Sequence, residues 1–375
     1  MEFSALKILL ANISFANYTG TEVVIRDLAS AFRSAGHQPI VFSPRLGKIA
    51  EELTGMGIQV TDDLSRLSVT PDIIHGQHHR VLVEALLRFP ATPAISICHD
   101  ATNAMDEPYL FQRVRRYLAV DERCRQRVER ALGTNVGQIG IVPNAVDLAR
   151  FQIRDPLPPR PCKALIFSNY ARRNTHLKAI RTACRQTGLD LDVIGEGVGT
   201  QSTAPERELP RYDLVFAKAR CALEALAVGN AVVLCDFGRV GPYVTSGDLD
   251  RLRLMNFGQG VLTDPLDPGK IADQIANYDP VDAMTVTRRI RAEAGLDAAC
   301  ANWIRLYTEA IEEFDPRDVN RVTEYREFAD YLATWHYIKR VEWEKEQALR
   351  LKAIPLVGAQ AVQFAHWAYK RWISP

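Results

Sequence analysis

Short apolar runs alternate with amphipathic stretches through the first part of the chain. Residues 7–11 form one apolar run, and residues 39–43 form the next one, just after the Gly-His pair at 36–37. Between them, residues 21–35 repeat apolar positions at the 3.6-residue spacing of a helix. The apolar side of this predicted helix carries Val24, Leu28, Ala31 and Phe32. The pattern predicts a βαβ unit, from which α/β folds are built.

A similar pattern organises residues 212–236, YDLVFAKARCALEALAVGNAVVLCD. It predicts a strand at 213–216, a small-residue turn at 217–221, a helix at 222–228 and a buried strand at 231–235. A helix that follows a strand in this way points its free N–H groups at the carboxyl edge of the sheet, where phosphates bind. Lys218 and Arg220 add two cations there, and Glu224 lies in the first predicted turn of the helix.

A proline-rich stretch, RDPLPPRPC at residues 154–162, separates two such series, because the next strand is predicted at 164–168. We therefore expect an α/β protein with two Rossmann-like, doubly wound domains that face a cleft. The expected boundaries are 1–153 for the first domain, 154–162 for the linker, 163–312 for the second domain and 313–375 for a C-terminal helical extension.

Composition narrows the class of protein. Of the 375 residues, 24% are charged and 47% hydrophobic, and the formal net charge of +1 argues against a nucleic-acid partner. The seven cysteines are scattered singly, which favours a reducing compartment over a disulfide framework or a zinc site. The acidic start, Met1-Glu2, predicts no signal peptide, and no apolar run reaches the roughly 20 residues of a membrane span. We expect a cytoplasmic protein.

The segment LEALAVGNAVVLCD, residues 223–236, resembles the donor-nucleotide segment of retaining GT-B glycosyltransferases of family four (glycosyl transferases group 1). In that family the second Glu of an E-x7-E motif binds the ribose hydroxyls, which implies this role for Glu224, with Ala222 and Leu223 beside it. The position of the first Glu holds Phe216, so this half of the motif is missing. The alternative is that Glu224 is an ordinary carboxylate near a helix start.

Other segments resemble the same family in the same order along the chain. Gly20, within YTGTE, takes the place of the glycine loop that lets a ligand approach backbone amides. Residues 71–76, PDIIHG, and residues 139–151, IGIVPNAVDLARF, resemble two further segments, with Ala145 in place of the usual Gly. Gly195 and Gly197 follow a strand predicted at 191–194 and resemble the family's glycine loop near the base.

His99 and Asp100 follow the strand predicted at 94–98. In the family a His at this place touches the donor sugar near the reacting centre, which implies a catalytic role for this pair. A neutral imidazole offers one donor and one acceptor, which suits a sugar hydroxyl. The alternative is a capping or core histidine. His75, His78 and His79 lack further ligands at metal-binding spacing, so we expect one of them to orient substrate and the others to lie on the surface.

The resemblance implies that cations bind the donor diphosphate in place of a metal. The family's Arg and Lys positions after the first strand of the second domain do not match here, but Arg172 and Arg173 could supply the charge from shifted positions, together with Lys218 and Arg220. We expect no metal and no cofactor. Two D-x-D strings, at 190–192 and 248–250, follow no apolar strand and are predicted to be turn or helix-start residues.

Two regions lie outside these motifs. Residues 111–133 carry seven arginines interleaved with acids, and we expect a helix, a short strand at 118–120 and a second helix with a mostly solvated face. The alternative is a weak surface for anionic lipid or a phosphorylated acceptor. In the tail, Tyr325, Phe328, Leu332 and Trp335 recur at helical spacing. In the GT-B fold such helices cross back onto the first domain. A second pattern at 356–372, with cations, predicts packing against the protein or a second subunit, or peripheral membrane contact.

The resemblance therefore implies a glycosyltransferase that moves a sugar from a nucleotide-diphosphate sugar to a hydroxyl acceptor, with retention and without a metal. Its first domain would take the acceptor and its second the nucleotide-sugar. We expect it to serve polysaccharide or cell-envelope synthesis, in the cytoplasm or peripherally at the inner face of the membrane. Two alternatives stay open: a nucleotide-sugar 2-epimerase of the same fold, and a non-catalytic partner protein.

Overall fold

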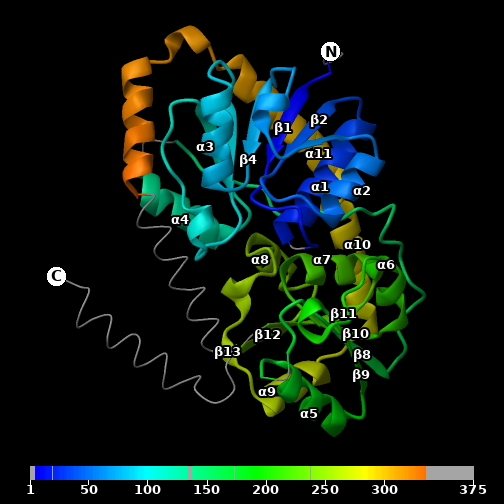
Figure 1. Cartoon of the computed structure of the whole chain (residues 1–375). Helices are drawn as coiled ribbons and strands as arrows, with labels where there is room; N and C mark the ends of the chain where they lie inside the picture. Colours follow the sequence, from blue (N-terminus) through cyan, green and yellow to red (C-terminus); the bar gives the residue numbers. More distant parts are fainter. Residues whose placement is uncertain (1–4, 19, 134–136, 173, 237, 335–375) are drawn as a thin grey trace, which may run out of the picture. The chain divides into compact units, whose positions relative to one another are not determined.

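The computed structural model describes residues 5–18, 20–133, 137–172, 174–236 and 238–334 (Figure 1). The chain forms two compact units. The first comprises residues up to 108 and 112–318, and the second comprises residues 109–111 with the chain from 319 onward. The two predicted α/β series both lie in the first unit.

The first series forms a parallel sheet with strand order β3-β2-β1-β4-β5-β6-β7. Apolar strands with helical crossovers give this order because each crossover returns the chain to a parallel neighbour. The strands are β1 Lys7–Ala11, β2 Gln38–Phe42, β3 Gln59–Thr61, β4 Ile73–Gly76, β5 Ala94–Cys98, β6 Val114–Ala119 and β7 Gly140–Ile141. The helices are α1 Gly20–Ser34, α2 Lys48–Gly55, α3 His79–Arg88 and α4 Glu122–Leu132.

The second series forms a sheet with the order β13-β12-β11-β10-β8-β9, in which β8 to β11 are parallel and β12 and β13 are antiparallel. The strands are β8 Lys163–Phe167, β9 Asp190–Ile194, β10 Leu214–Ala217, β11 Ala231–Asp236, β12 Arg239–Tyr243 and β13 Asp264–Pro265. The helices are α5 Leu177–Thr187, α6 Pro205–Glu208, α7 Ala219–Val228, α8 Leu249–Leu254, α9 Pro268–Ala276 and α10 Pro280–Glu293. Residues 154–162, between the two sheets, form no helix or strand.

The second sheet is buried on both faces, as the apolar runs predict. Val215 and Ala217 of β10 belong to one core cluster, on the side of α7. Leu214 and Phe216 belong to the other, on the side of α5 and α9. Phe216, which stands where the family motif has its first Glu, is therefore a core residue. The fold is α/β with two Rossmann-like sheets, as predicted.

Helix α11, Leu296–Glu312, corrects the predicted end of the second domain at residue 312. It packs against α1 and β5 of the first sheet. The chain crosses over at Val146, whose N–H donates to Ala294 at 2.9 Å and whose carbonyl accepts from Leu296 at 2.9 Å. Tyr307 then meets His75 of β4, with 2.6 Å between the hydroxyl and Nδ1. The crossing helix thus precedes residue 313, the predicted start of the extension.

Several other features were predicted wrongly from local sequence patterns. Residues 111–113 are not helical, and β6 begins at Val114 rather than at residue 118. Asp190 and Asp192 belong to strand β9, not to a turn, whereas Asp248 and Asp250 do mark the start of α8. Strand β12 lies within residues 236–247, whose glycines and proline predict a loop. Within the arginine-rich region, Arg113 and Arg127 are buried rather than solvated.

The second unit contains a helical segment at residues 321–334. Within this unit, the rings of Phe111 and Phe328 lie 5.2 Å apart and those of Tyr109 and Tyr331 lie 5.0 Å apart. The pattern predicted at 356–372, with Trp335, lies outside the described residues. No helix among the described residues is long and apolar enough to cross a membrane.

Arg113 ties the start of β6 to the turn after α3. Its guanidinium donates to the carbonyls of Leu86, Phe89 and Thr92. Replacing Arg113 by Met should therefore lower the free energy of unfolding by about 3 kcal/mol, because buried carbonyls lose charged donors. Urea denaturation measures this loss. The exposed neighbour Arg115, replaced by Met, should cost at most about 0.5 kcal/mol, and equal losses would contradict the assigned role of Arg113.

Candidate active site

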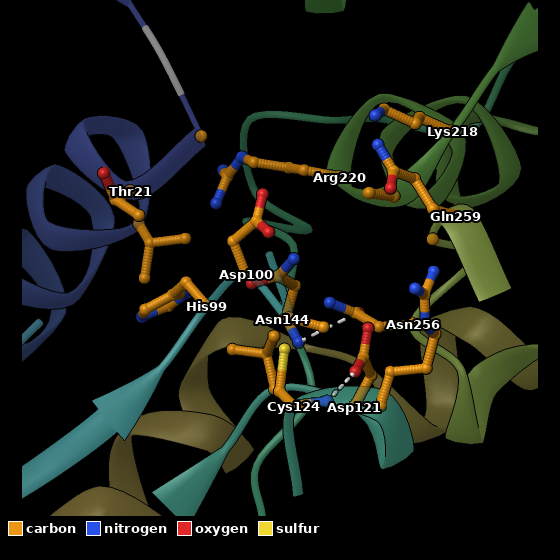
Figure 2. A pocket seen from close by; sticks show the side chains of 17 residues that line it. Thr21, His99, Asp100, Asp121, Cys124, Asn144, Lys218, Arg220, Asn256 and Gln259 are labelled. Atoms are coloured by element: carbon orange, nitrogen blue, oxygen red, sulfur yellow. Dashed lines mark hydrogen bonds between the residues drawn. The ribbon is translucent and has the colours of Figure 1, made fainter. Parts of the chain in front are cut away.

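A cavity of about 180 Å³ lies between elements of the two sheets, at the carboxyl ends of their strands (Figure 2). One wall comes from the start of α1, the loop after β5 and the start of α4. The other comes from the start of α7 and the loop after α8. The lining residues that carry polar or charged side chains are Thr21, His99, Asp100, Asp121, Arg123, Asn144, Lys218, Arg220, Asn256 and Gln259.

A second cavity of about 110 Å³ adjoins the first, since Gly20 and Arg220 line both. Glu224 lies in its wall, together with Tyr18, Asn169 and residues 201–203. A side chain at position 20 would meet no atom within 4 Å, so Gly20 keeps the passage between the cavities open. Each cavity alone is below the roughly 300–1,000 Å³ of a ligand pocket. Their junction favours an elongated ligand that spans both.

Helix α7 begins at Ala219 with Lys218 as its N-cap, three residues earlier than predicted. The N–H of Ala219 donates to the carbonyl of Phe257 at 2.7 Å, a bond that the local sequence does not reveal. Within the described residues, the N–H groups of Arg220 and Cys221 have no acceptor, so the helix end can still receive an anion. Glu224 consequently lies in the second turn of α7. A favourable interaction with the helix dipole therefore does not explain why a carboxylate occupies this position.

The rim of the first cavity is strained. Ala219, Asn256 and Phe257 adopt positive φ angles of 48°, 49° and 51°. Such angles cost roughly 1–3 kcal/mol for residues with side chains, and they cluster at ligand-binding sites. The bond from Ala219 to Phe257 joins the strained residues to one another, so the two loops hold a common geometry at the start of α7.

Arg220 occupies the centre of a buried charge network. It pairs with Asp27 of α1 and, at 2.8 Å from Nε, with Oε1 of Glu224. Arg26 extends the network, donating to Asp27 at 2.6 Å from Nη2 and lying 3.7 Å from Glu52 of α2. Burial raises the pKa of Glu224 although Arg220 opposes this effect. Burial also acts to raise the pKa of Asp27, but Arg220 and Arg26 outweigh it and hold the value below its usual range.

Lys218 lies on the opposite side of the same helix end. It pairs with Asp236, the last residue of β11, and its Nζ lies 5.3 Å from the centre of the Tyr170 ring. Figure 2 shows Lys218 at the edge of the cavity, near Gln259 and away from His99. Lys218 and Arg220 are therefore both positioned by carboxylates before any ligand binds.

His99 and Asp100 line the first cavity, as their place after β5 predicts. Burial lowers the pKa of His99 to about 3, so the imidazole is neutral at physiological pH. Its Nε2 is buried and has no hydrogen-bond partner in the described part of the chain. Asp100 is held in a turn, because its Oδ1 accepts from the N–H groups of Thr102 and Asn103 at 2.6 and 3.0 Å.

Asp106 positions the segment that carries His99. Its Oδ1 accepts from the N–H groups of His99 and Asp100 at 2.8 and 3.2 Å. Burial raises the pKa of Asp106 to about 7, and the charge of nearby Asp100 adds to the effect although the two amides oppose it. No local pattern marks Asp106 as a site residue, because only the fold brings it back to the end of β5.

Several predicted binding residues do not line either cavity. Ala222 and Leu223 are fully buried in the core, and the N–H of Ala222 donates to the carbonyl of Lys218, so these two lie beneath the site. Gly195 and Gly197 pack against the loop after β8, where an added Cβ would meet carbonyl oxygens at 2.0 and 2.4 Å. Arg172 is exposed at the surface. Arg173 lies outside the described residues.

His75, His78 and His79 lie in the interior of the protein and not on its surface. Burial lowers the pKa of His75 to about 3, and the pKa values of His78 and His79 to about 4. All three side chains are buried, which corrects the prediction that two of them lie on the surface. The described residues contain no cluster of His, Cys, Asp and Glu side chains that could hold a metal ion.

A larger groove, of about 930 Å³, lies between α1 and α11, with Ala31, Ala35, Cys300 and Ile304 in its walls. It contains neither His99 nor Glu224 nor the strained backbone. We therefore place the candidate site at the two smaller, adjoining cavities. The residues there that the sequence did not reveal are Asp27, Asp121, Arg123, Asn144, Asn256 and Gln259. A polar residue just after a predicted strand was the available signal for Asp121.

Two Rossmann-like sheets with a polar site at their carboxyl edges define an α/β protein of the class in which ligands bind at this edge. Residues 18–150 match Glycosyltransferase Family 4. This part of the chain is therefore a glycosyltransferase domain, and the protein is an enzyme of the glycosyltransferase class. No curated protein sequence matched the chain.

Solved structures support the GT-B fold of glycosyltransferases. The chain is similar to a glycosyltransferase from Rickettsia africae, with a TM-score of 0.60 and 13% identity over 83% of this chain and 100% of that one. It is also similar to Anabaena HepE in complex with UDP, with a TM-score of 0.60 and 14% identity over 81% of this chain and 100% of that one. A structure of HepE with UDP-glucose has a TM-score of 0.52, with 16% identity over 88% of this chain and 100% of that one.

Asp106 should make stability depend on pH. Its folded-state pKa of about 7 lies above the roughly 3.9 of an unfolded chain, so folding takes up a proton between these values. The free energy of unfolding of the wild type should therefore fall, relative to that of Asp106→Asn, as pH rises from about 4 to about 7, by at most about 4 kcal/mol. Urea denaturation of both proteins at pH 5 and pH 8 measures this change. A stability difference that is the same at both values would rule it out.

Proposed function

We propose that this protein transfers a sugar from a nucleotide-diphosphate sugar to a hydroxyl acceptor, with retention and without a bound metal. The observation that carries the proposal is the pair of cavities that meet at Gly20 and Arg220, with the start of α7 between them. This arrangement has three parts, namely two cavities and a helix start between them. A nucleotide-sugar also has three parts: a nucleoside, a diphosphate and a sugar. We assign each part to a different region of this arrangement.

The nucleoside would lie in the cavity that contains Glu224. This carboxylate is buried beside Arg220, and it lines a cavity together with Phe167, the last residue of β8, and Asn169 from the loop that follows. A buried carboxylate that can accept from two neighbouring hydroxyls suits a ribose. The UDP bound to HepE makes UDP the first nucleotide to test.

The diphosphate would lie at the start of α7, against the N–H groups of Arg220 and Cys221. Lys218 and Arg220 supply two cations, each already oriented by a carboxylate. Preorganised cations and a helix dipole can stabilise the charge that develops on a departing diphosphate, which is the work that a metal does in other enzymes. This support for a metal-independent reaction comes from the groups that are present.

The sugar would occupy the cavity lined by His99, whose neutral imidazole offers one donor and one acceptor for sugar hydroxyls. Retention, use in polysaccharide or cell-envelope synthesis and a cytoplasmic or peripheral membrane location rest on the family resemblance alone. The same holds for an oligomer formed through the C-terminal helices.

Replacing Glu224 by Ala should weaken UDP binding about tenfold or more, since a charge-assisted hydrogen bond contributes roughly 1.5–3 kcal/mol. Calorimetric titration with UDP, GDP and ADP measures the loss and identifies the base. Glu208→Ala is the matched control, because Glu208 pairs with Arg211 at the surface and lines neither cavity. Wild-type UDP affinity in the Glu224 variant would remove the ribose assignment.

Replacing His99 by Ala should lower kcat of sugar transfer at least tenfold while changing UDP affinity less than twofold, because the imidazole would contact the sugar and not the nucleotide. Steady-state turnover and calorimetry separate the two quantities. His37→Ala, which removes a histidine that lines neither cavity, is the control. Unchanged turnover in His99→Ala would contradict the role. Conversion of UDP-N-acetylglucosamine to another sugar nucleotide without acceptor would instead indicate an epimerase.

A further inference from the structure

Arg123 is a cation in an unfavourable place. It is the second residue of α4, where the positive end of the helix dipole opposes a positive side chain. It is half-buried, and it lines the first cavity. The helix dipole disfavours a positive charge at this position, and the residue lies in the wall of a candidate site. This combination points to a ligand that compensates for the charge.

No acid of the described chain neutralises Arg123. Of the nearest carboxylates in the sequence, Glu122 accepts from Arg125 at 2.8 and 2.6 Å, and Asp121, which lines the same cavity, accepts at Oδ1 from the N–H of Cys124 at 2.8 Å. Within the described residues, Arg123 forms no ion pair or hydrogen bond. This distinguishes it from Lys218 and Arg220, which line the same cavity and are both paired with carboxylates.

The stem of Arg123 is held in place across the cavity. A Cβ added to Gly260, in the loop after α8, would lie 2.9 Å from Cδ of Arg123. The absence of a side chain at Gly260 therefore leaves room for the arginine to lie against the opposite wall. A side chain packed in this way loses less conformational freedom on binding than one that is free in solvent.

Amide groups surround the same part of the cavity. Asn144, Asn256 and Gln259 line it, and Oδ1 of Asn256 accepts from the N–H of Asn144 at 3.2 Å. Figure 2 shows Asn256 and Gln259 on the side of the cavity away from His99. Since Oδ1 of Asn256 is used, its amino group is the part left to donate to a ligand. An unpaired guanidinium near amide donors is suited to a carboxylate or phosphate.

We propose that Arg123 binds an anionic group carried by the sugar-side ligand, either a carboxylate or a phosphate, and so determines specificity for charged sugars. This inference rests on the proposed function, in which Lys218, Arg220 and the start of α7 hold the donor diphosphate. The anionic group that meets Arg123 is an additional one. It can belong to the donor sugar, as in a nucleotide-linked uronic acid, or to the acceptor, as in a sugar phosphate.

Two binding experiments distinguish these sources. In the first, calorimetry compares UDP-glucuronate with UDP-glucose, which tests a charge on the donor sugar. In the second, protein saturated with UDP is titrated with glucuronate, glucose 6-phosphate and glucose, which tests a charge on the acceptor. Both are performed on the wild type, on Arg123→Gln and on Arg125→Gln. Arg125 lies two residues further along α4, pairs with Glu122 and Glu129, and lines neither cavity.

We expect the wild type to prefer the charged ligand at least tenfold in one of the two experiments, as a charge-assisted hydrogen bond allows. Arg123→Gln should abolish this preference and leave UDP affinity within twofold of wild type, whereas Arg125→Gln should retain the preference. No preference in either experiment, or a preference that survives Arg123→Gln, overturns the inference. An equal loss of UDP affinity assigns Arg123 to the diphosphate and also overturns it. A wild type that binds none of UDP, GDP and ADP contradicts the proposed function itself.

Discussion

Arg220 connects the two halves of the site through carboxylates on two helices, Asp27 of α1 and Glu224 of α7. All three side chains are buried, and an unpaired buried charge costs several kcal/mol. The pairing therefore restrains the distance between the start of α7 and the side of α1. Because Arg220 also lines both cavities, the contact that holds these elements together gives the site its shape.

The cations of the site are largely balanced before a ligand arrives. Lys218 pairs with Asp236, and Arg220 pairs with two acids. A diphosphate must therefore share these cations with carboxylates, and the helix end and exclusion of water become important to its binding. The strained residues Ala219, Asn256 and Phe257 lie in the two loops that meet at this helix end, joined by the bond from Ala219 to Phe257. Arg123 differs from these paired cations, and this difference is the reason for assigning it to an anionic group of the ligand.

Local patterns predicted much of the fold and part of the site. Strands β1 and β5 and helix α1 were placed to within a residue or so, because their periodicity depends only on neighbouring positions. The same approach failed where distant contacts decide. Arg113 and Arg127 belong to a charge-rich stretch that is typical of a solvated face, yet carbonyls from other elements make them core residues. Helix α7 begins early because a carbonyl of Phe257 accepts its first N–H.

The sequence by itself determined two α/β series, a break between them, the placement of His99 after a strand and that of Lys218 between a strand and a helix, because these features follow from local spacing. Only the tertiary structure decided which polar groups meet. Asp27 and Arg220, or Arg123 and Gly260, are far apart in the chain and carry no shared local signal. They converge because parallel strands bring their carboxyl ends to one edge, and because α11 returns the chain to the first sheet.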